Sequence, residues 1–294
     1  MNNVYIMSAN RSAIGGFGGT LKNHCPVDLG TLVAKEAIAR SGFETNEVEH
    51  AVFGNVIHTE PRDMYVSRVI ALQAGMDKAS AALTVNRLCG SGLQAIVSAS
   101  QILMLGDASV AMAGGVEVMS NGAHIVQGFR WGSRMGDGQV HDMMLGALHD
   151  PFGHGHMGIT AENISSRYQI SREMQDEFAL TSQKRAHNAI ENGIFKDQIL
   201  PIEIKTRKGI EIFEIDEHPK PETSMETLTG LRTAFKKDGV VTAGNASGIN
   251  DGASALVLAN EEKAKMGKPL ARIVSYGFGG VDPDEMGMGP VPAS

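Results

Sequence analysis

The stretch TVNRLCGSGLQAIVSASQ, residues 84–101, joins a short apolar run to a helical stretch through Cys89 and two glycines. Its first residues are typical of a buried strand, and the run after Gly92 has the small and apolar residues of a helix that packs on a sheet. A strand that leads directly into a helix is the basic step of an α/β fold. The stretch therefore predicts a helix-covered sheet, with one of the chain's two cysteines at a helix N-terminus.

The residues around this stretch continue the alternation of strand and helix. Strands are predicted over 2–9, 50–58, 82–88 and 108–115, and helices over 27–42, 64–76 and 90–106. Asp28 is the predicted cap of the first helix, which Gly42 ends, and Gly106 closes the third. This spacing predicts βαβ units around a mostly parallel, buried sheet.

A different pattern follows Ser120. Residues 121–160 are rich in Gly, His and Met without a clear period. A long helix is predicted after a Ser171 cap, and a β-hairpin is predicted to turn at Lys208-Gly209. We interpret 121–248 as an inserted subdomain, after which the strand and helix pattern returns.

Length and composition exclude several classes of protein. A chain of 294 residues is long enough for about two domains. A net charge of −7 and few aromatic residues argue against a nucleic-acid binder. Two cysteines, no basic leader and no run of roughly 18 apolar residues predict a cytoplasmic protein outside the membrane. His154 and His156, spaced by one residue, are a weak metal signal, and no metal is predicted.

Cys89 is the strongest candidate for chemistry. The amides and partial positive charge at a helix N-terminus favour a thiolate. The same amides could hold an oxyanion, and Gly90 and Gly92 would let a substrate approach the backbone. A buried structural cysteine is the alternative from residue type alone, but the glycine-flanked setting favours a reactive thiol. Cys25, just before a proline and a helix start, is interpreted as structural.

A second candidate is the stretch TAGNASGINDGASALV, residues 242–257, in which Gly, Asn, Ser and Asp form a loop before an apolar helix or strand. Loops of this composition expose backbone donors and small hydroxyls to a ligand. A tight connection that needs many glycines is equally compatible with it. The chain has no dinucleotide-binding glycine pattern, no phosphate-binding GK[ST] loop and no G-x-S-x-G turn at Cys89.

Five segments together resemble the thiolase family, the acyl-CoA C-acyltransferases. They are NRLCGSGLQAI (86–96), GGVEVMS (114–120), HMGITAEN (156–163), QDEFALTSQKRA (175–186) and TAGNASGINDGA (242–253). They occur in the family's order, and the resemblance runs through essentially the whole chain. It points to an acetyl-CoA C-acetyltransferase or a β-ketothiolase, and residues 54–69 are similar to bacterial β-ketothiolases of broad chain-length tolerance.

The resemblance implies an α/β protein of thiolase fold, with αβαβα layers, a mixed sheet with covering helices and an inserted loop domain. It implies an N-terminal thiolase domain over 1–120, completed by 249–270, and a CoA-binding loop domain over 121–248. Residues 271–294 would begin a C-terminal thiolase domain that is truncated. The family also implies a homodimer or homotetramer, with residues 130–137 matching its tetramerisation loop.

For activity, the resemblance implies that Cys89 attacks an acyl-CoA and holds the acyl group. A second acetyl-CoA then attacks in a Claisen condensation, or CoA cleaves a 3-ketoacyl-CoA in reverse. No cofactor is implied, because coenzyme A thioesters are the substrates. The positions that match the CoA site are Leu148, His156, Met157, Lys220, Phe235, Ala243 and Ser247. Among them, Ser247 matches the pantetheine contact, and Lys220 lies near the position of the adenine.

Three family motifs do not occur in these 294 residues: Gly-His-Pro, Asn-Glu-Ala-Phe and Cys-x-Gly. In the family, the histidine activates the nucleophile and the second cysteine moves the α-proton. We therefore expect a fragment, or the product of a shortened gene, that is poorly active alone. The alternatives are a ketoacyl synthase that uses an acyl carrier protein, and a non-catalytic lipid- or CoA-binding relative.

Overall fold

The computed structural model describes residues 3–132 and 134–294, which form two compact units. The sheet unit comprises Met1–Met143, Lys196–Glu217 and Asn250–Val274, and the helical unit comprises Met144–Phe195, His218–Ile249 and Ser275–Ser294. Residues 121–143 and 196–217 thus group with the sheet, although the sequence places them in the inserted subdomain. The predicted functional domain boundaries stay a prediction.

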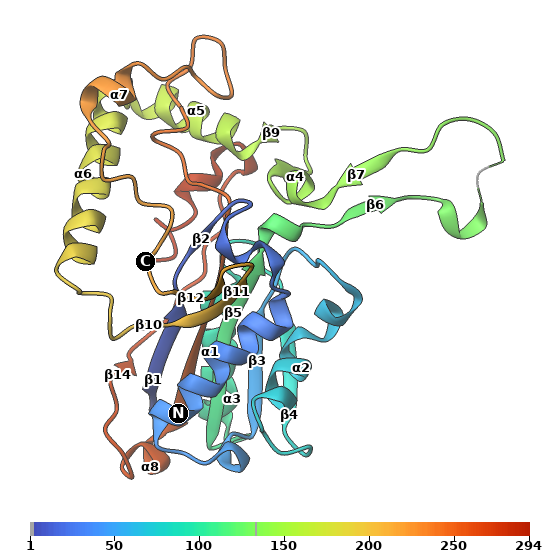
Figure 1. The fold of residues 1–294 in the computed structure, drawn as a ribbon, viewed down its shortest axis with the longest axis vertical. Helices are drawn as coiled ribbons and strands as arrows, with labels where there is room; N and C mark the ends of the chain where they lie inside the picture. Colours follow the sequence, from blue (N-terminus) through green and yellow to red (C-terminus); the bar gives the residue numbers. More distant parts are fainter. Residues whose placement is uncertain (1–2, 133) are drawn as a thin grey trace. The chain divides into compact units, whose positions relative to one another are not determined.

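An eight-stranded sheet is the centre of the sheet unit (Figure 1). Its main path runs β10-β1-β13-β5-β3-β4, while β14 pairs with β1 and β2 with β13. The bounds are β1 Val4–Ser12, β2 Gly15–Gly16, β3 His50–Gly54, β4 Ala81–Val85, β5 Val110–Val118, β10 Ile199–Leu200, β13 Asn250–Asn260 and β14 Ala271–Ile273.

The sheet is mixed, as the resemblance implies, and the prediction of a mostly parallel sheet is wrong. β3 runs parallel to β4 and β5, whereas β13 runs antiparallel to both β1 and β5. The helices α2 (Val66–Gln73) and α3 (Ser91–Leu105) connect β3 to β4 and β4 to β5. Such a crossover returns the chain to the end of the sheet where the previous strand began, so the strands run parallel. β13 arrives after most of the helical unit, and no local pattern fixes its direction.

Helices cover both faces of the sheet. α1 (Pro26–Ser41) and α2 (Val66–Gln73) share one face, where Gly30 of α1 lies against Ile70 and Val116. α3 (Ser91–Leu105) covers the other, where its Ala95, Ala99 and Leu103 pack in one buried cluster with Val52 and Leu258. The short helix α8 spans Glu261–Ala264.

The predicted helix ends are confirmed and one predicted cap is wrong. Gly42 and Gly106 end α1 and α3 in the left-handed conformation, at φ 81° and 84°. Such a conformation favours glycine. The N-cap of α1 is Cys25 rather than Asp28, because Pro26 occupies the first helical position and places Asp28 inside the first turn.

One stretch, Leu88–Leu105, is long and apolar enough by length and composition to cross a bilayer. The expectation that no run approaches that length is therefore wrong. The buried side of α3 lies in the core of the sheet unit, which is the arrangement of a core helix. A single such helix is weak evidence for a membrane span.

The helical unit contains α5 (Met157–Tyr168), α6 (Arg172–Glu191), α7 (Met225–Thr229), the hairpin of β8 (His149–Asp150) and β9 (Gly155–His156), and the 3-10 segment Pro283–Met288. Ser171 Oγ accepts a hydrogen bond from Met174 N, which confirms the predicted cap of α6. α4 (Met143–Ala147) starts at the end of the sheet unit.

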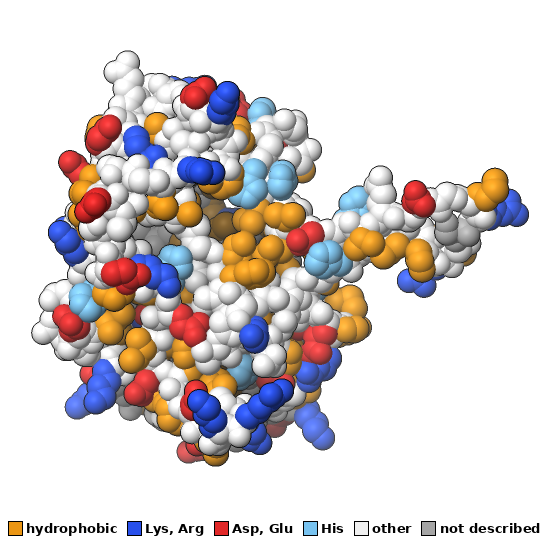
Figure 2. All heavy atoms as spheres, turned by 45° about the horizontal axis from the view of Figure 1, so that its top comes forward, with side chains coloured by type: hydrophobic (Ala, Val, Ile, Leu, Met, Phe, Trp, Pro, Cys, Tyr) orange, Lys and Arg blue, Asp and Glu red, His pale blue; other side chains and the backbone are white. Residues whose placement is uncertain are grey.

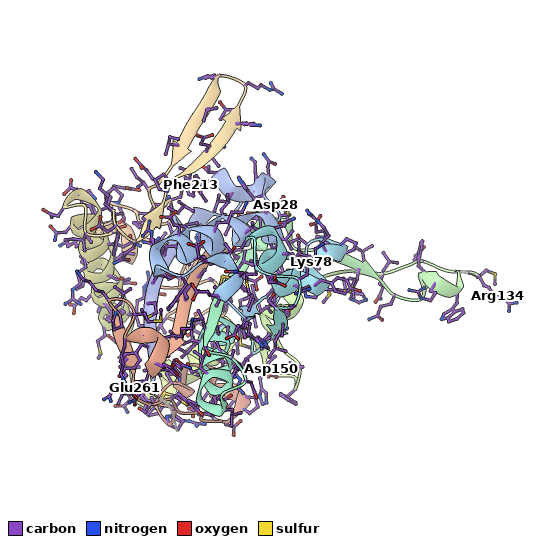
Figure 3. All side chains as sticks on the ribbon, turned by 90° about the horizontal axis from the view of Figure 1, so that it is seen from below. Asp28, Lys78, Arg134, Asp150, Phe213 and Glu261 are labelled. Carbon is purple, nitrogen blue, oxygen red and sulfur yellow. The ribbon has the colours of Figure 1, made fainter. Side chains whose placement is uncertain are left out.

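Two further hairpins extend from the sheet unit. β11 (Ile202–Thr206) and β12 (Gly209–Phe213) turn at Arg207-Lys208, one residue before the predicted turn, and Figure 3 shows Phe213 at the base of this hairpin. β6 (His124–Val126) and β7 (Val140–Asp142) form an arm with Arg134 near its tip (Figure 3). The arm carries the predicted tetramerisation loop, of which Ser133 lies outside the described residues.

Candidate active site

Cys89 lies on a tight turn between β4 and α3. Leu88 has φ 45°, a left-handed conformation that is uncommon for a side chain of this size. Gly90 N donates to Arg87 O at 3.0 Å, and Ser91 N donates to Leu88 O at 2.9 Å. Two overlapping turns thus span residues 87–91, and Cys89 is exposed there as a free thiol. The alternative of a buried structural cysteine is wrong.

Ser91 braces this turn from inside. Its buried hydroxyl accepts a hydrogen bond from Arg87 N at 2.8 Å and donates one to Leu88 O at 2.6 Å. Leu88 N donates to Asn86 Oδ1 at 3.0 Å. Strained backbone persists where its surroundings determine it, and such positions cluster at functional sites. These hydrogen bonds therefore fix the conformation of the turn that carries Cys89.

Two glycines of the sheet let α3 begin directly on the strands. A Cβ at Gly54, the last residue of β3, would lie 2.7 Å from Ser91 Cβ. A Cβ at Gly115 of β5 would lie 3.5 Å from Gly92 Cα. A side chain at position 54 would push the first turn of α3 off the sheet. Gly54 is not among the predicted site residues, although a glycine at the end of a strand signals such an approach.

The first turn of α3 presents backbone donors beside the thiol. Gln94 N makes the first helical hydrogen bond, to Gly90 O at 2.8 Å. Among the described residues, the amides of Gly92 and Leu93 donate to no protein acceptor. Unpaired N-terminal amides of this kind bind anions and stabilise developing negative charge. An exposed thiol next to such donors can form a covalent bond to a carbonyl carbon.

The second thiol has a different setting. Cys25 is half-buried, and its Sγ accepts a hydrogen bond from Arg62 Nη2 at 3.2 Å. Burial, with a contribution from the hydrogen bond to Asp28, raises the pKa of Cys25 to about 11. A thiol held protonated is a poor nucleophile, which agrees with its interpretation as structural.

Four of the predicted ligand-binding residues meet in the helical unit. The His156 ring stacks on Phe235 with centroids 4.6 Å apart, and His149 meets its edge at 5.1 Å. Met157 N donates to Leu148 O at 2.8 Å. Leu148, His156, Met157 and Phe235, hereafter the His156 group, are therefore neighbours.

His156 is fixed as a hydrogen-bond donor. Gly158 N donates to His156 Nδ1 at 3.0 Å, so the proton of the neutral ring lies on Nε2. Burial, and then the neighbouring His149, lowers the pKa of His156. The neutral ring is therefore the form present at physiological pH, and its Nε2–H can donate to a ligand.

Gly158 is part of this arrangement and was missed by the sequence analysis. A Cβ at Gly158 would lie 2.2 Å from Phe235 Cδ2, closer than any side chain tolerates. The ring of Phe235 therefore occupies the space that a side chain at position 158 would need. The only signal in the sequence is the position of this glycine inside the segment HMGITAEN, residues 156–163.

The other three predicted residues are exposed: Lys220, Ala243 and Ser247. Among the described residues, no hydrogen bond or ring contact joins them to the His156 group. Lys220 N donates to Gln183 Oε1 of α6 at 2.8 Å. Their predicted role in ligand binding stays a prediction.

The loop that carries Ala243 and Ser247 is held by hydrogen bonds to buried side chains. Asn245 Nδ2 donates to the buried Asp176 of α6 at 2.9 Å, and Asn245 Oδ1 accepts from Thr242 N at 2.8 Å. The buried Glu162 carboxylate accepts the amides of Val240 and Val241. The loop is thus a tight connection that exposes Ala243 and Ser247, and its role in ligand binding stays a prediction.

No metal site is built into this part of the chain. No group of three or more His, Cys, Asp or Glu side chains with metal-binding geometry occurs within residues 3–132 and 134–294.

A family model described as the thiolase N-terminal domain matches residues 4–262. The β-ketothiolase BktB of Cupriavidus necator is 55% identical over 294 residues, and the match covers 99% of this chain and 75% of the relative. The acetyl-CoA acetyltransferase of Syntrophomonas wolfei is 47% identical, with 99% and 74% covered.

Solved structures agree with these matches. The acetyl-CoA acetyltransferase of Bacillus anthracis superposes with a TM-score of 0.96 at 48% identity, covering 100% of this chain and 75% of the other. Human mitochondrial 3-ketoacyl-CoA thiolase in complex with CoA gives a TM-score of 0.95 at 40% identity, covering 99% and 73%.

The two thiols should differ in reactivity. With iodoacetamide at pH 7.5 we expect Cys89 to be alkylated at least about tenfold faster than Cys25, because Cys89 is exposed, whereas Cys25 is half-buried and burial raises its pKa to about 11. Peptide mass spectrometry against time measures both rates in one sample, and Cys89→Ser identifies the fast peptide. Equal rates would contradict the geometry of the turn.

Gly158→Ala should destabilise the chain by about 1–3 kcal/mol, because the added methyl group displaces the Phe235 ring. The matched control is Gly146→Ala in α4, where nothing lies within 4 Å of the added Cβ, and which should be neutral or stabilising by up to about 1 kcal/mol. Urea unfolding compares the two variants with the parent. Similar free energies for both variants would show that the Phe235 ring yields without cost.

Proposed function

The chain belongs to the thiolase family, and from this premise we propose that it is an acyl-CoA C-acyltransferase whose nucleophile is Cys89. The observation that carries the proposal is the exposed thiol on a strained, internally braced turn at the N-terminus of α3. Its relatives carry the names β-ketothiolase, acetyl-CoA acetyltransferase and 3-ketoacyl-CoA thiolase.

In the first half-reaction, Cys89 Sγ attacks the thioester carbonyl carbon of an acyl-CoA as a thiolate. The carbonyl oxygen becomes an oxyanion, which backbone amides at the turn stabilise. Each such donor contributes roughly 2.7–4 kcal/mol. The bond from the carbonyl carbon to the CoA sulfur then breaks, CoA leaves as a thiolate and takes up a proton, and the acyl group stays on Cys89.

In the second half-reaction, a second acetyl-CoA loses its α-proton to a base. Its carbanion attacks the acyl carbonyl on Cys89, a carbon–carbon bond forms and the Cys89 thiolate is released. Thiolysis of a 3-ketoacyl-CoA is the same sequence reversed, so ping-pong kinetics follow in either direction. The Gly-His-Pro and Cys-x-Gly motifs that resemblance links to the proton transfers do not occur in these 294 residues. We therefore propose that the 294-residue chain captures an acyl group better than it turns over substrate.

The His156 group is proposed to bind the CoA arm. Leu148, Met157 and Phe235 supply apolar surface, and His156 Nε2–H supplies one directed donor. Ser247 is proposed to contact pantetheine, Ala243 to line the same site and Lys220 to lie near the adenine. No resident cofactor takes part, since CoA thioesters are the substrates.

We also propose a homodimer or homotetramer, in the cytoplasm and in fatty acid metabolism. Among the residues that the structure describes, β4 pairs with β3 alone and presents Leu83, which is 43% exposed. Uncovered strand edges with apolar side chains favour association. The arm exposes Phe129 and Trp131, and Figure 2 shows hydrophobic side chains along it.

Acyl capture tests the proposal directly. Incubation with acetyl-CoA should add one acetyl group to the Cys89 peptide, seen by mass spectrometry, and Cys89→Ala should abolish it. The control Cys25→Ala should capture the acetyl group as the parent does. Capture from an acyl carrier protein but not from CoA would contradict the thiolase assignment and favour a ketoacyl synthase.

Turnover of acetoacetyl-CoA by the 294-residue chain should be weak. Each missing acid–base group removes roughly 10²–10⁴-fold in rate. Loss of the thioester absorbance measures this turnover. A rate typical of a complete thiolase would show that residues within this chain carry out the proton transfers and would contradict the prediction.

A further inference from the structure

Glu117 faces the same side of the sheet as the Cys89 turn. Along β5, Ala111 and Ala113 pack in the core cluster with α3, and a Cβ at Gly115 would meet Gly92 at the start of that helix. Side chains two residues apart on a strand share a face. Glu117 therefore lies on the α3 face of β5, one step beyond the start of the helix.

The Glu117 carboxylate holds the backbone that follows β3. It accepts hydrogen bonds from Val56 N and, at 3.2 Å, from Ile57 N. Asn55 ties the same segment to its neighbours, because its backbone N–H donates to Val85 O at 3.3 Å and its Nδ2 donates to Val116 O at 2.9 Å. Val85 is the last residue of β4, immediately before the residues that lead into the turn.

Residues 54–57, hereafter the strip, thus connect Glu117 to the turn. At one end Gly54 lies against Ser91, the residue that braces the turn by two hydrogen bonds. At the other end Val56 and Ile57 donate to Glu117. A shift of the strip changes the contact on which the first residue of α3 rests.

The charge on Glu117 is poised to change near neutral pH. Burial, with a smaller contribution from the charge of Asp63, raises its pKa to about 7, although the two amide hydrogen bonds oppose that rise. Asp63 is itself buried, and its Oδ2 accepts hydrogen bonds from Thr59 and Glu60. Among the described residues, Asp63 is the charged group that raises the pKa of Glu117.

We propose that Glu117 is a positioning residue for Cys89: its ionised carboxylate holds the strip, and the strip holds the turn that presents the thiol. Hydrogen bonds to an ionised carboxylate are stronger than those to a neutral group. Loss of the charge therefore loosens the strip. The proposal rests on Cys89 being the reactive group of the proposed function.

The experiment is the rate of iodoacetamide alkylation at Cys89 from pH 5.5 to 9, read by peptide mass spectrometry. Beyond the general rise of thiol alkylation with pH, we expect an inflection from Glu117 near pH 7 in the parent chain. Glu117→Gln should lose this inflection and react about three- to tenfold more slowly than the parent at pH 8. Below pH 6 the two chains should converge, because the parent carboxyl is then neutral.

A matched control is available at the opposite end of β5. Glu49 Oε2 accepts the amides of Ser109 and Val110, so it is also a carboxylate that holds two consecutive amides of the same sheet. Glu49→Gln should leave the alkylation profile of Cys89 unchanged. If Glu49→Gln changes the profile as Glu117→Gln does, the effect is a general loss of stability and the proposal is wrong.

The outcomes separate this proposal from the function itself. A Cys89 that is not alkylated in the parent chain overturns the proposed nucleophile. A Cys89 that reacts with one and the same profile in parent and Glu117→Gln overturns only the role of Glu117. Should Glu117→Gln fail to fold, the parent still decides: a profile without an inflection near pH 7, or amide exchange of Val56 and Ile57 that does not quicken at lower pH after correction for intrinsic rates, contradicts the proposal.

Discussion

The close approach of α3 to the backbone of β3 and β5 is the constraint on which the site depends. Gly54 and Gly115 leave no side chain between the strands and the first residues of the helix. Because the helix starts on the sheet itself, the chain passes from Val85 to Ser91 through a short, tight turn. That turn carries the exposed thiol, and the unpaired amides lie beside it.

Hydrogen bonds within the turn offset its backbone strain. A left-handed Leu88 costs of order 1–3 kcal/mol. The two hydrogen bonds of Ser91 Oγ and the one from Leu88 N to Asn86 Oδ1 contribute roughly 0.5–1.5 kcal/mol each. The two sums are of the same size, so these three hydrogen bonds can offset the strain at Leu88. A residue that shifts Ser91 therefore acts on Cys89 directly.

Sequence reasoning succeeds where a local pattern has one structural solution. The strand before Cys89, the helix after it and the glycine ends of α1 and α3 follow from periodicity and from the left-handed conformation. It fails where the partner is distant in sequence. Three examples are the antiparallel pairing of β13, the contact of Gly54 with Ser91 and the contact of Gly158 with Phe235. In each, the type of one residue does not indicate which distant residue it contacts.

Glu117 is a distant partner of the Cys89 turn that lowers stability. A buried carboxylate with a pKa near 7 binds a proton in the folded chain over a pH range where the unfolded chain, near the ordinary value of 4.5, has released it. The free energy of unfolding therefore falls as pH rises from about 4.5 to about 7 at this residue. A neutral glutamine or an apolar side chain avoids that cost. The charge at Glu117 thus lowers the stability of the folded chain. Its carboxylate nevertheless accepts hydrogen bonds from two backbone amides of the strip, which lies against Ser91, and in this way it contributes to the geometry of the thiol.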